Sequence, residues 1–340
     1  MPRMFHRGLI PALICALAVA FTSLPGRAQP SPTTWKVSIG ADSPDHAIQG
    51  QDFYPRTMTV NADDSITFTK GAILGHTVTF LSGTKRPELE LPQPDKRVLF
   101  NPEVAFPQGG QTYDGTGVAN SGVLDGVGKS YTLTFTKPGR YAFVCMLHPG
   151  MQGTVVVQPA GSKPPLTQAD YDKASAAQWA ESLEAGEALK ASWRVASAVS
   201  ASGTVYTTAL LSNPQAHVSL FRFTPGPLTI KAGSTVRWVM KDMFEIHTVT
   251  FPGANNVPAF LTPEPRKQGP PKIFFNVKGV APFGGPRHAG SSGLYNSGIL
   301  VPVNPPGPTT YSLTFSKPGT YTYWCVVHVP EGMSGTIIVQ

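Results

Sequence analysis

The stretch that decides the fold is YTLTFTKPGRYAFVCMLH, which runs from Tyr131 to His148. Its first six residues alternate hydroxyl or phenol side chains with apolar ones, the period of a half-buried β-strand. The Lys-Pro-Gly that begins at Lys137 is typical of a tight turn. A second apolar run then leads into Cys145. The stretch therefore predicts a β-hairpin whose second strand ends at a cysteine and a histidine.

The same hairpin occurs a second time near the C-terminus, as YSLTFSKPGTYTYWCVVH over residues 311–328, with ten of eighteen positions identical. Other landmarks recur in the same order. They are HTVTF at 76–80 and 247–251, NSGVL at 120–124 with NSGIL at 296–300, and WKV at Trp35 with WRV at Trp193. A repeat of this length, in register, predicts two homologous domains in tandem.

The segment between the two halves has a different composition. Residues 166–193 are rich in Ala, Glu, Gln and Lys and contain no proline, and Thr167 with Asp170 resembles a capping box. We therefore predict one connecting helix over about 168–191. The short strands and frequent turns on both sides predict an all-β protein of two Greek-key β-sandwiches. The expected domains are residues 34–158 and 193–340, joined by a linker at 159–192.

The first 28 residues have the pattern of a secretory signal peptide. Arg3 and Arg7 precede an apolar run from Leu9 to Phe21, and small residues lead to a cleavage point after Ala28. The apolar run is too short for a comfortable membrane span. We therefore expect an exported protein, periplasmic or extracellular, with no membrane span in the mature chain.

Cleavage at Ala28 changes the charge and the cysteine count. The net charge falls from +7 to +4, and no basic run with interleaved aromatic residues occurs, so nucleic acid is not an expected partner. Cys15 is lost with the signal peptide, and Cys145 and Cys325 remain. A disulfide between them is one possibility in an exported protein. It is disfavoured because each cysteine lies in its own Cys-x-x-His motif.

The residues around these cysteines suit a soft metal ion. Cys145 is followed by His148 and Met151, and a thiolate, an imidazole and a thioether together favour copper over zinc. Cys325 is followed in the same way by His328 and Met333. A trigonal copper site needs a second imidazole, and the first residue of each HTVTF segment, His76 or His247, can supply it. Two histidines, a cysteine and a weakly bound methionine are the pattern of an electron-transfer copper centre.

On these motifs each half resembles the cupredoxins, the blue copper proteins that include plastocyanin and amicyanin. The spacing Cys-x2-His-x2-Met in the first half is similar to that of amicyanin, and Cys-x2-His-x4-Met in the second is similar to that of plastocyanin. The resemblance implies two cupredoxin domains with one type 1 copper ion each. The implied ligands are His76, Cys145, His148 and Met151 for one ion, and His247, Cys325, His328 and Met333 for the other.

The resemblance also implies a function. We expect an electron carrier that cycles between Cu(I) and Cu(II), with a cytochrome or another oxidoreductase as redox partner. Partners are expected to contact His148 and His328 on loops near the surface. Different loop lengths, and Val144 in one half where Trp324 stands in the other, predict unequal potentials for the two sites.

Two other functions remain open. One is copper storage or delivery without redox turnover. The other is an enzyme similar to nitrite reductases or multicopper oxidases. Those enzymes carry His-x-His pairs and a histidine next to the cysteine ligand, whereas Val144 and Trp324 precede the cysteines here. We therefore expect no enzymatic activity. The remaining histidines of the mature chain, His46, His217 and His288, are expected to be solvated or structural.

Overall fold

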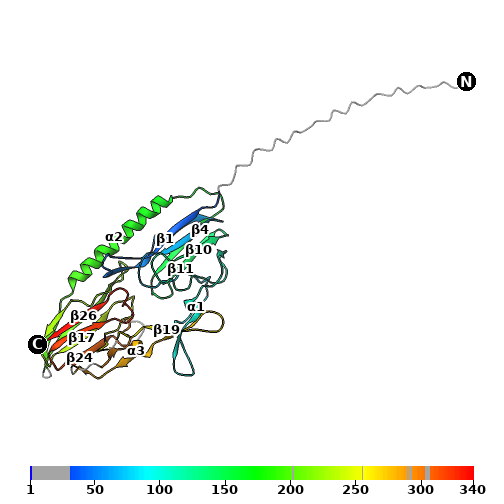
Figure 1. Cartoon of the computed structure of the whole chain (residues 1–340). Helices are drawn as coiled ribbons and strands as arrows, with labels where there is room; N and C mark the ends of the chain where they lie inside the picture. Colours follow the sequence, from blue (N-terminus) through cyan, green and yellow to red (C-terminus); the bar gives the residue numbers. More distant parts are fainter. Residues whose placement is uncertain (2–30, 201–202, 255, 289, 291–292, 303–306) are drawn as a thin grey trace. The chain divides into compact units, whose positions relative to one another are not determined.

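The stretch from Tyr131 to His148 forms two strands of a two-sheet sandwich in the computed structural model, β10 (Ser130–Phe135) and β11 (Gly139–Val144) (Figure 1). The predicted hairpin was wrong, because β10 pairs with strands of one sheet and β11 pairs with strands of the other, so the Lys-Pro-Gly turn crosses between the sheets. The structure describes Met1 and residues 31–200, 203–254, 256–288, 290, 293–302 and 307–340. Apart from Met1, the predicted signal peptide lies outside the described residues.

The first sandwich is built from ten strands in two sheets. One layer contains, in spatial order, β2 (Ile48–Tyr54), β1 (Thr34–Asp42), β4 (Ser65–Lys70), β10 (Ser130–Phe135) and β8 (Thr112–Tyr113). The other contains β3 (Thr57–Asn61), β12 (Gln152–Gln158), β11 (Gly139–Val144), β5 (Thr79–Phe80) and β9 (Ala119–Asn120). The short hairpin of β6 (Glu90–Pro92) and β7 (Val98–Phe100) and the helix α1 (Pro102–Ala105) lie between β5 and β8 in the chain.

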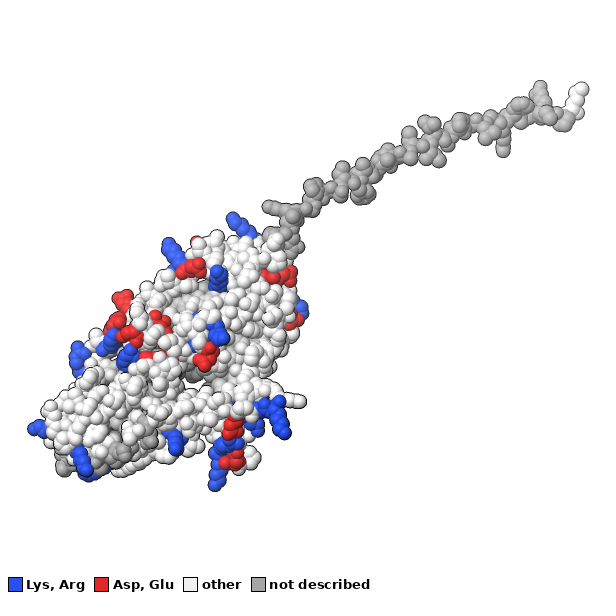
Figure 2. Space-filling model, viewed as in Figure 1, with Lys and Arg blue, Asp and Glu red and all other residues white. Residues whose placement is uncertain are grey.

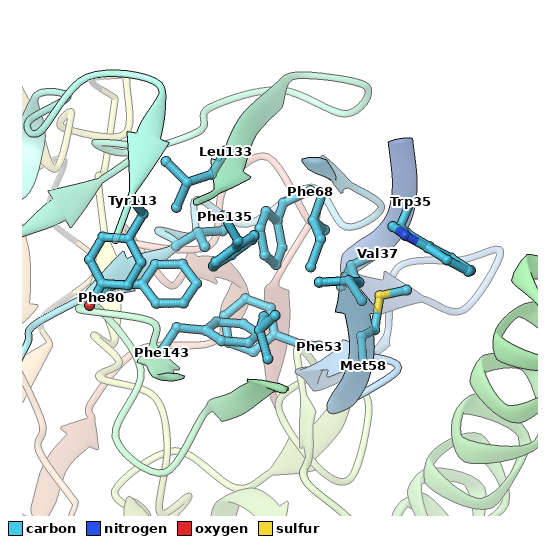
Figure 3. Close-up of a cluster of buried hydrophobic side chains, with 14 of the residues drawn as sticks. Trp35, Val37, Phe53, Met58, Phe68, Phe80, Tyr113, Leu133, Phe135 and Phe143 are labelled. Carbon is cyan, nitrogen blue, oxygen red and sulfur yellow. The ribbon is translucent and has the colours of Figure 1, made fainter. Parts of the chain in front are cut away.

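The core of this sandwich follows the period-two pattern of the sequence. Ile66 and Phe68 of β4 and Leu133 and Phe135 of β10 are fully buried, while the hydroxyl residues between them are less buried. Figure 3 shows Phe68, Leu133 and Phe135 in the same cluster as Phe143 of β11 in the opposite sheet, and the rings of Phe68 and Phe143 are in contact. The alternation was therefore a correct guide to which face of each strand is buried.

The second sandwich has the same layers. One sheet contains β15 (Val218–Leu220), β14 (Gly203–Asn213), β17 (Thr235–Lys241), β24 (Thr310–Phe315) and β22 (Arg287–His288), with β13 (Ala196–Ser200) paired to β14. The other contains β16 (Leu228–Ile230), β26 (Ser334–Val339), β25 (Gly319–Trp324), β18 (Thr250–Phe251), β23 (Tyr295–Ser297) and β21 (Pro282–Phe283). A hairpin, β19 (Leu261–Glu264) with β20 (Lys272–Phe275), and the helix α3 (Val277–Val280) complete it.

The match of Trp35 with Trp193 was wrong. Trp35 lies in β1 and pairs with Ile66 of β4, whereas Trp193 is the residue that follows the connecting helix. In the second sandwich Tyr206 of β14 pairs with Val236 of β17 in the corresponding position. The three-residue likeness is too short to place a strand, and the parallel pairing decides the correspondence.

The predicted connecting helix is confirmed as α2 (Gln168–Ser192), and Thr167 and Asp170 form its capping box. The helix packs on both sandwiches (Figure 1). Tyr171 near its start belongs to the first core, and Leu183 and Leu189 further along pack against a cluster that contains Ile48 of β2 and Leu220 of β15. The linker is therefore a packed element of the fold.

The sheets of the two sandwiches are continuous at two places. β15 pairs antiparallel with β2, with Leu220 opposite Ile48, and β20 pairs antiparallel with β7, with Phe274 opposite Leu99. The first pairing makes one eleven-stranded sheet across both halves. Residues 32–340 accordingly form one compact unit. These pairings fix the two sandwiches against each other.

Surface charge is sparse. On the face seen in Figure 2, positive and negative side chains are interspersed over a largely uncharged surface. Of the helices that the structure describes, none has the length and apolar character needed to cross a bilayer.

Candidate metal centres

The first candidate centre lies where β11 ends. This strand delivers Cys145, the loop that follows returns His148, and His76 comes from the segment that leads into β5. The Cys145 Sγ atom lies 3.3 Å from Nδ1 of His148 and 3.8 Å from Nδ1 of His76. The three side chains are buried, and they form one of two clusters able to hold a metal ion among the described residues.

The second centre repeats this geometry. Cys325 follows β25, and its Sγ atom lies 3.3 Å from Nδ1 of His328 and 3.7 Å from Nδ1 of His247. The two Nδ1 atoms are 3.2 Å apart. In both halves the same ring nitrogen of each histidine therefore faces the sulfur.

The spacing of these atoms fits a bound metal ion. Donor atoms that each lie about 2.0–2.3 Å from one ion are separated by roughly 3–4 Å from each other, as these are. Both methionines are buried beside the centres. The backbone N–H of Cys145 donates to the carbonyl of Met151 at 2.9 Å, and Cys325 donates to Met333 at 3.0 Å, so each loop closes on its cysteine. A thiolate, two imidazoles and a thioether form the donor set that suits copper.

In each centre a threonine makes hydrogen bonds with the cysteine sulfur and with the residue that follows the cysteine. The backbone N–H of Thr77 donates to Cys145 Sγ at 3.4 Å, and the Thr77 hydroxyl oxygen accepts from the N–H of Met146 at 2.7 Å. In the second half, Thr248 donates to Cys325 Sγ at 3.3 Å and accepts from Val326 at 2.8 Å. The residue after each first histidine thus holds the cysteine sulfur and the start of the ligand loop in place.

The repeated Asn-Ser-Gly segments have a turn role and a supporting role. The Asn120 Oδ1 atom accepts from the N–H of Gly122, as in an Asx turn, and also from the hydroxyl of Thr79 at 2.8 Å. The Thr79 hydroxyl in turn contacts that of Thr77 at 3.1 Å. Asn296 makes the same bonds in the second half. Each Asn-Ser-Gly segment therefore forms a turn that holds the threonines next to the cysteine in place.

The surroundings of the thiols favour the form that binds metal. Burial would raise the pKa of Cys145, but the His76 imidazole and the N–H of Thr77 outweigh it and hold this pKa below its ordinary value. Burial acts in the same way on Cys325, and its two histidine neighbours hold the pKa of this thiol well below the usual range. A thiolate is the species that coordinates copper. Both cysteines are free and buried, so the disulfide considered above is not formed.

The outer ring nitrogens distinguish the centres. His247 Nε2 lies 3.1 Å from a carboxylate oxygen of Asp242, which is fully buried. His76 Nε2 in the first half is buried without a hydrogen-bond partner among the described residues. Sequence reasoning missed Asp242, although a carboxylate five residues before a candidate ligand was a visible signal.

Glu245 was also missed, and it lies between the two centres. Its Oε1 atom is 3.2 Å from Nε2 of His148, and its Oε2 atom is 3.5 Å from Nε2 of His328. Burial would raise the pKa of Glu245, but the imidazoles of His148 and His328 lower it to about 2. One buried carboxylate therefore faces an imidazole of each candidate ligand set.

The expectation that His148 and His328 lie near the surface was wrong. Their exposed fractions are 3% and 0%, and the His328 ring stacks on Phe221 with centroids 4.3 Å apart. In a lone sandwich these loops would be at one end of the molecule, but here the two ends face each other. The residues that follow the histidines, Pro149 and Val329, are exposed.

A cavity of about 860 Å³ lies beside these loops and has walls from both halves. Most of its lining is apolar, including Leu147 from the first half and Phe260 and Val327 from the second, while His148 and Glu245 provide polar atoms. The other histidines that the structure describes lie outside both clusters. His288, for example, is buried and stacks on Tyr295 with ring centroids 4.4 Å apart, as expected for a structural residue.

Comparison with known proteins agrees with this geometry. The family described as copper binding proteins, plastocyanin/azurin family, matches residues 42–158 and 296–340, which include seven of the eight proposed ligands. The plastocyanin of Scenedesmus fuscus is 33% identical over 118 residues, 35% of this chain and 86% of that protein. The chloroplastic plastocyanin of Tetradesmus obliquus is 31% identical over 124 residues, 36% of this chain and 66% of that protein.

Among solved structures, an amicyanin variant in its reduced state is 20% identical and has a TM-score of 0.23, covering 37% of this chain and 82% of that one. The plastocyanin match extends over most of the relative's length and carries the assignment. The chain therefore belongs to the plastocyanin/azurin family of copper-binding proteins.

Proposed function

We propose that this chain is an exported electron-transfer protein with two type 1 copper sites. His76, Cys145, His148 and Met151 would hold one ion, and His247, Cys325, His328 and Met333 would hold the other. The observation that carries the proposal is that Nδ1 of two histidines faces a buried cysteine sulfur in each half, at 3.3–3.8 Å.

Copper supplies a one-electron couple between Cu(I) and Cu(II) when it is bound. The protein's part is to keep the donor atoms in one arrangement for both states. Thr77 and Thr248 restrain the cysteine sulfurs, and the bonds from Cys145 to Met151 and from Cys325 to Met333 restrain the loops. A buried, restrained donor set needs little rearrangement when its charge changes, which favours rapid electron transfer.

A redox partner, a cytochrome or another oxidoreductase, would have to exchange electrons without touching the ligand imidazoles. Pro149 and Val329 are the exposed residues nearest in sequence to His148 and His328. We place partner contact at these loops. The low surface charge favours docking on small apolar areas over strong electrostatic steering.

The boundaries of the two halves are part of the proposal. We assign residues 34–158 and 193–340 to duplicated domains, 159–192 to the linker, and 1–28 to a signal peptide cleaved near Ala28. Sequencing the N-terminus of the protein recovered from its native compartment tests the cleavage. An intact N-terminus on cytosolic protein would contradict export.

Electron turnover separates this proposal from copper storage or delivery. The copper-loaded protein should be reduced by a mild one-electron reductant and reoxidised over many cycles with no loss of copper. Cys145→Ser and Cys325→Ser should each remove half of the exchanged electrons. Copper that leaves the protein on reduction would favour storage or delivery. Reduction of dioxygen or nitrite at a steady rate would favour an enzyme.

A further inference from the structure

The short segment between β17 and β18 contacts both candidate centres. Its Asp242 faces His247, and its Glu245 faces His148 of the first half and His328 of the second. Three of the four ligand imidazoles thus meet a carboxylate from this one segment. At the corresponding distance before His76, the first half has Leu74 where the second has Glu245. The arrangement is therefore asymmetric.

Glu245 is held in place by its surroundings. The Asp242 Oδ1 atom accepts the backbone N–H groups of Phe244 and Glu245, at 2.8 and 3.1 Å, and the hydroxyl of Ser219 at 3.2 Å. Only 4% of Glu245 is exposed. These bonds restrain the backbone of Glu245, and its two buried carboxylate oxygens lie 3.2 Å from Nε2 of His148 and 3.5 Å from Nε2 of His328.

The sheet pairings make this contact a fixed feature of the fold. Because β2 pairs with β15 and β7 pairs with β20, the two sandwiches are joined by hydrogen-bonded strands at two places. A flexible tether would let the loops separate, whereas two strand pairings hold them together. The path from His328 through Glu245 to His148 is therefore present in the resting molecule.

We propose that Glu245 couples the two ligand sets, so that one electron passes within the chain along His328, Glu245 and His148. The step is balanced in itself: one ligand set and its ion lose an electron, and the other set and its ion gain it. No bond is made and no proton moves. A route of bonded atoms and two short contacts carries an electron better than the same distance through empty space. This inference rests on the proposed function.

Asp242 sets the preferred direction of electron transfer between the two sites. Nδ1 of His247 faces the sulfur, and its Nε2 lies 3.1 Å from the Asp242 carboxylate. When Nδ1 binds the ion, Nε2 carries the hydrogen and can donate it to this carboxylate. A carboxylate on the outer nitrogen makes an imidazole a stronger donor, which stabilises the more oxidised metal. His76 has no such partner among the described residues. The second site should therefore have the lower potential and pass its electron to the first.

The first test needs no copper. In the metal-free protein, the ¹⁵N resonances of Nε2 in both His148 and His328 should shift in Glu245→Gln. Asp64→Asn is the matched control, because the Asp64 carboxylate is also buried but accepts from Trp35 and the N–H of Asn61 and not from a ligand imidazole. If Glu245→Gln moves neither resonance, or only one, the bridge between the two imidazoles does not exist in solution.

The second test measures the transfer. In the fully oxidised two-copper protein, a flash of photoreductant that supplies less than one electron per chain should be followed by redistribution between the two copper absorption bands. Its rate should not depend on protein concentration. Glu245→Ala should slow it at least about tenfold, and Asp64→Asn should not. An unchanged rate in Glu245→Ala with full copper content overturns the coupling.

The equilibrium distribution of one electron between the two sites tests the direction of transfer. In half-reduced protein the electron should reside mainly at the first site, and Asp242→Asn should move part of it to the second. An electron that rests at the second site in the unaltered protein refutes the assigned direction. Failure of the proposed function is recognised separately, because the protein would then show no copper-thiolate absorption bands. The ¹⁵N shifts of the metal-free protein would still decide whether Glu245 contacts both imidazoles.

Discussion

Thr77 offers a direct test of how the ligand loop is held. Its hydroxyl oxygen accepts the N–H of Met146 at 2.7 Å, next to Cys145. Thr77→Val keeps the shape of the side chain but leaves this buried N–H without an acceptor. Leaving a buried donor unsatisfied costs about 1–3 kcal/mol of the free energy of unfolding. Thr77→Ser keeps the oxygen and loses one methyl group, which costs about 1 kcal/mol or less.

The assay is urea unfolding of the metal-free protein. Midpoints are compared among variants whose unfolding free energy depends on urea concentration with the same slope. The midpoint should fall in the order unaltered protein, Thr77→Ser, Thr77→Val. Thr248→Val and Thr248→Ser provide an internal repeat, because Thr248 makes the same bond to Val326 at 2.8 Å. If Thr77→Val is as stable as Thr77→Ser, the hydroxyl bond contributes nothing and the support assigned to this threonine is refuted.

Other predictions concern the helix, the methionines and the metal. Tyr171→Phe removes the hydroxyl that accepts from the N–H of Thr59 at 2.8 Å, and should lower the free energy of unfolding by about 1–3 kcal/mol; an unchanged urea midpoint would argue against this anchor of α2. Met151→Leu should keep copper but raise the potential of the first site in voltammetry, because a donor to the oxidised ion is lost; no change would remove Met151 from the ligand set. Copper should raise the unfolding midpoint of the unaltered protein more than that of Cys325→Ser, because the variant has one binding site fewer; equal shifts would mean that Cys325 does not bind the ion.

Much of the fold could be predicted because it depends on local patterns. The alternation in Ser65–Lys70 and Ser130–Phe135 determines which residues reach the core, and the pair Thr167 and Asp170 marks where α2 begins. The donor residues could be proposed because the pattern is repeated, which singled out His76 and His247 from the other histidines. The structure brings the two histidines and the cysteine of each set together.

What could not be predicted depends on contacts between the halves. The resemblance to single-domain proteins implied that His148 and His328 lie near the surface, and both are buried because the second half covers the first. Glu245 acts through this same contact, so no pattern within one half reveals it. The pairing of Leu99 with Phe274 joins strands that are far apart in the chain and carry no matching motif.

Copper titration of the mature protein, followed by visible and electron paramagnetic resonance spectra, tests the central claim most directly. The account predicts two equivalents of copper per chain, each with an intense thiolate charge-transfer band. Cys145→Ser and Cys325→Ser should each remove one equivalent and its band. Binding of a single equivalent, or of two without thiolate bands, would contradict the claim that each half holds a type 1 copper site.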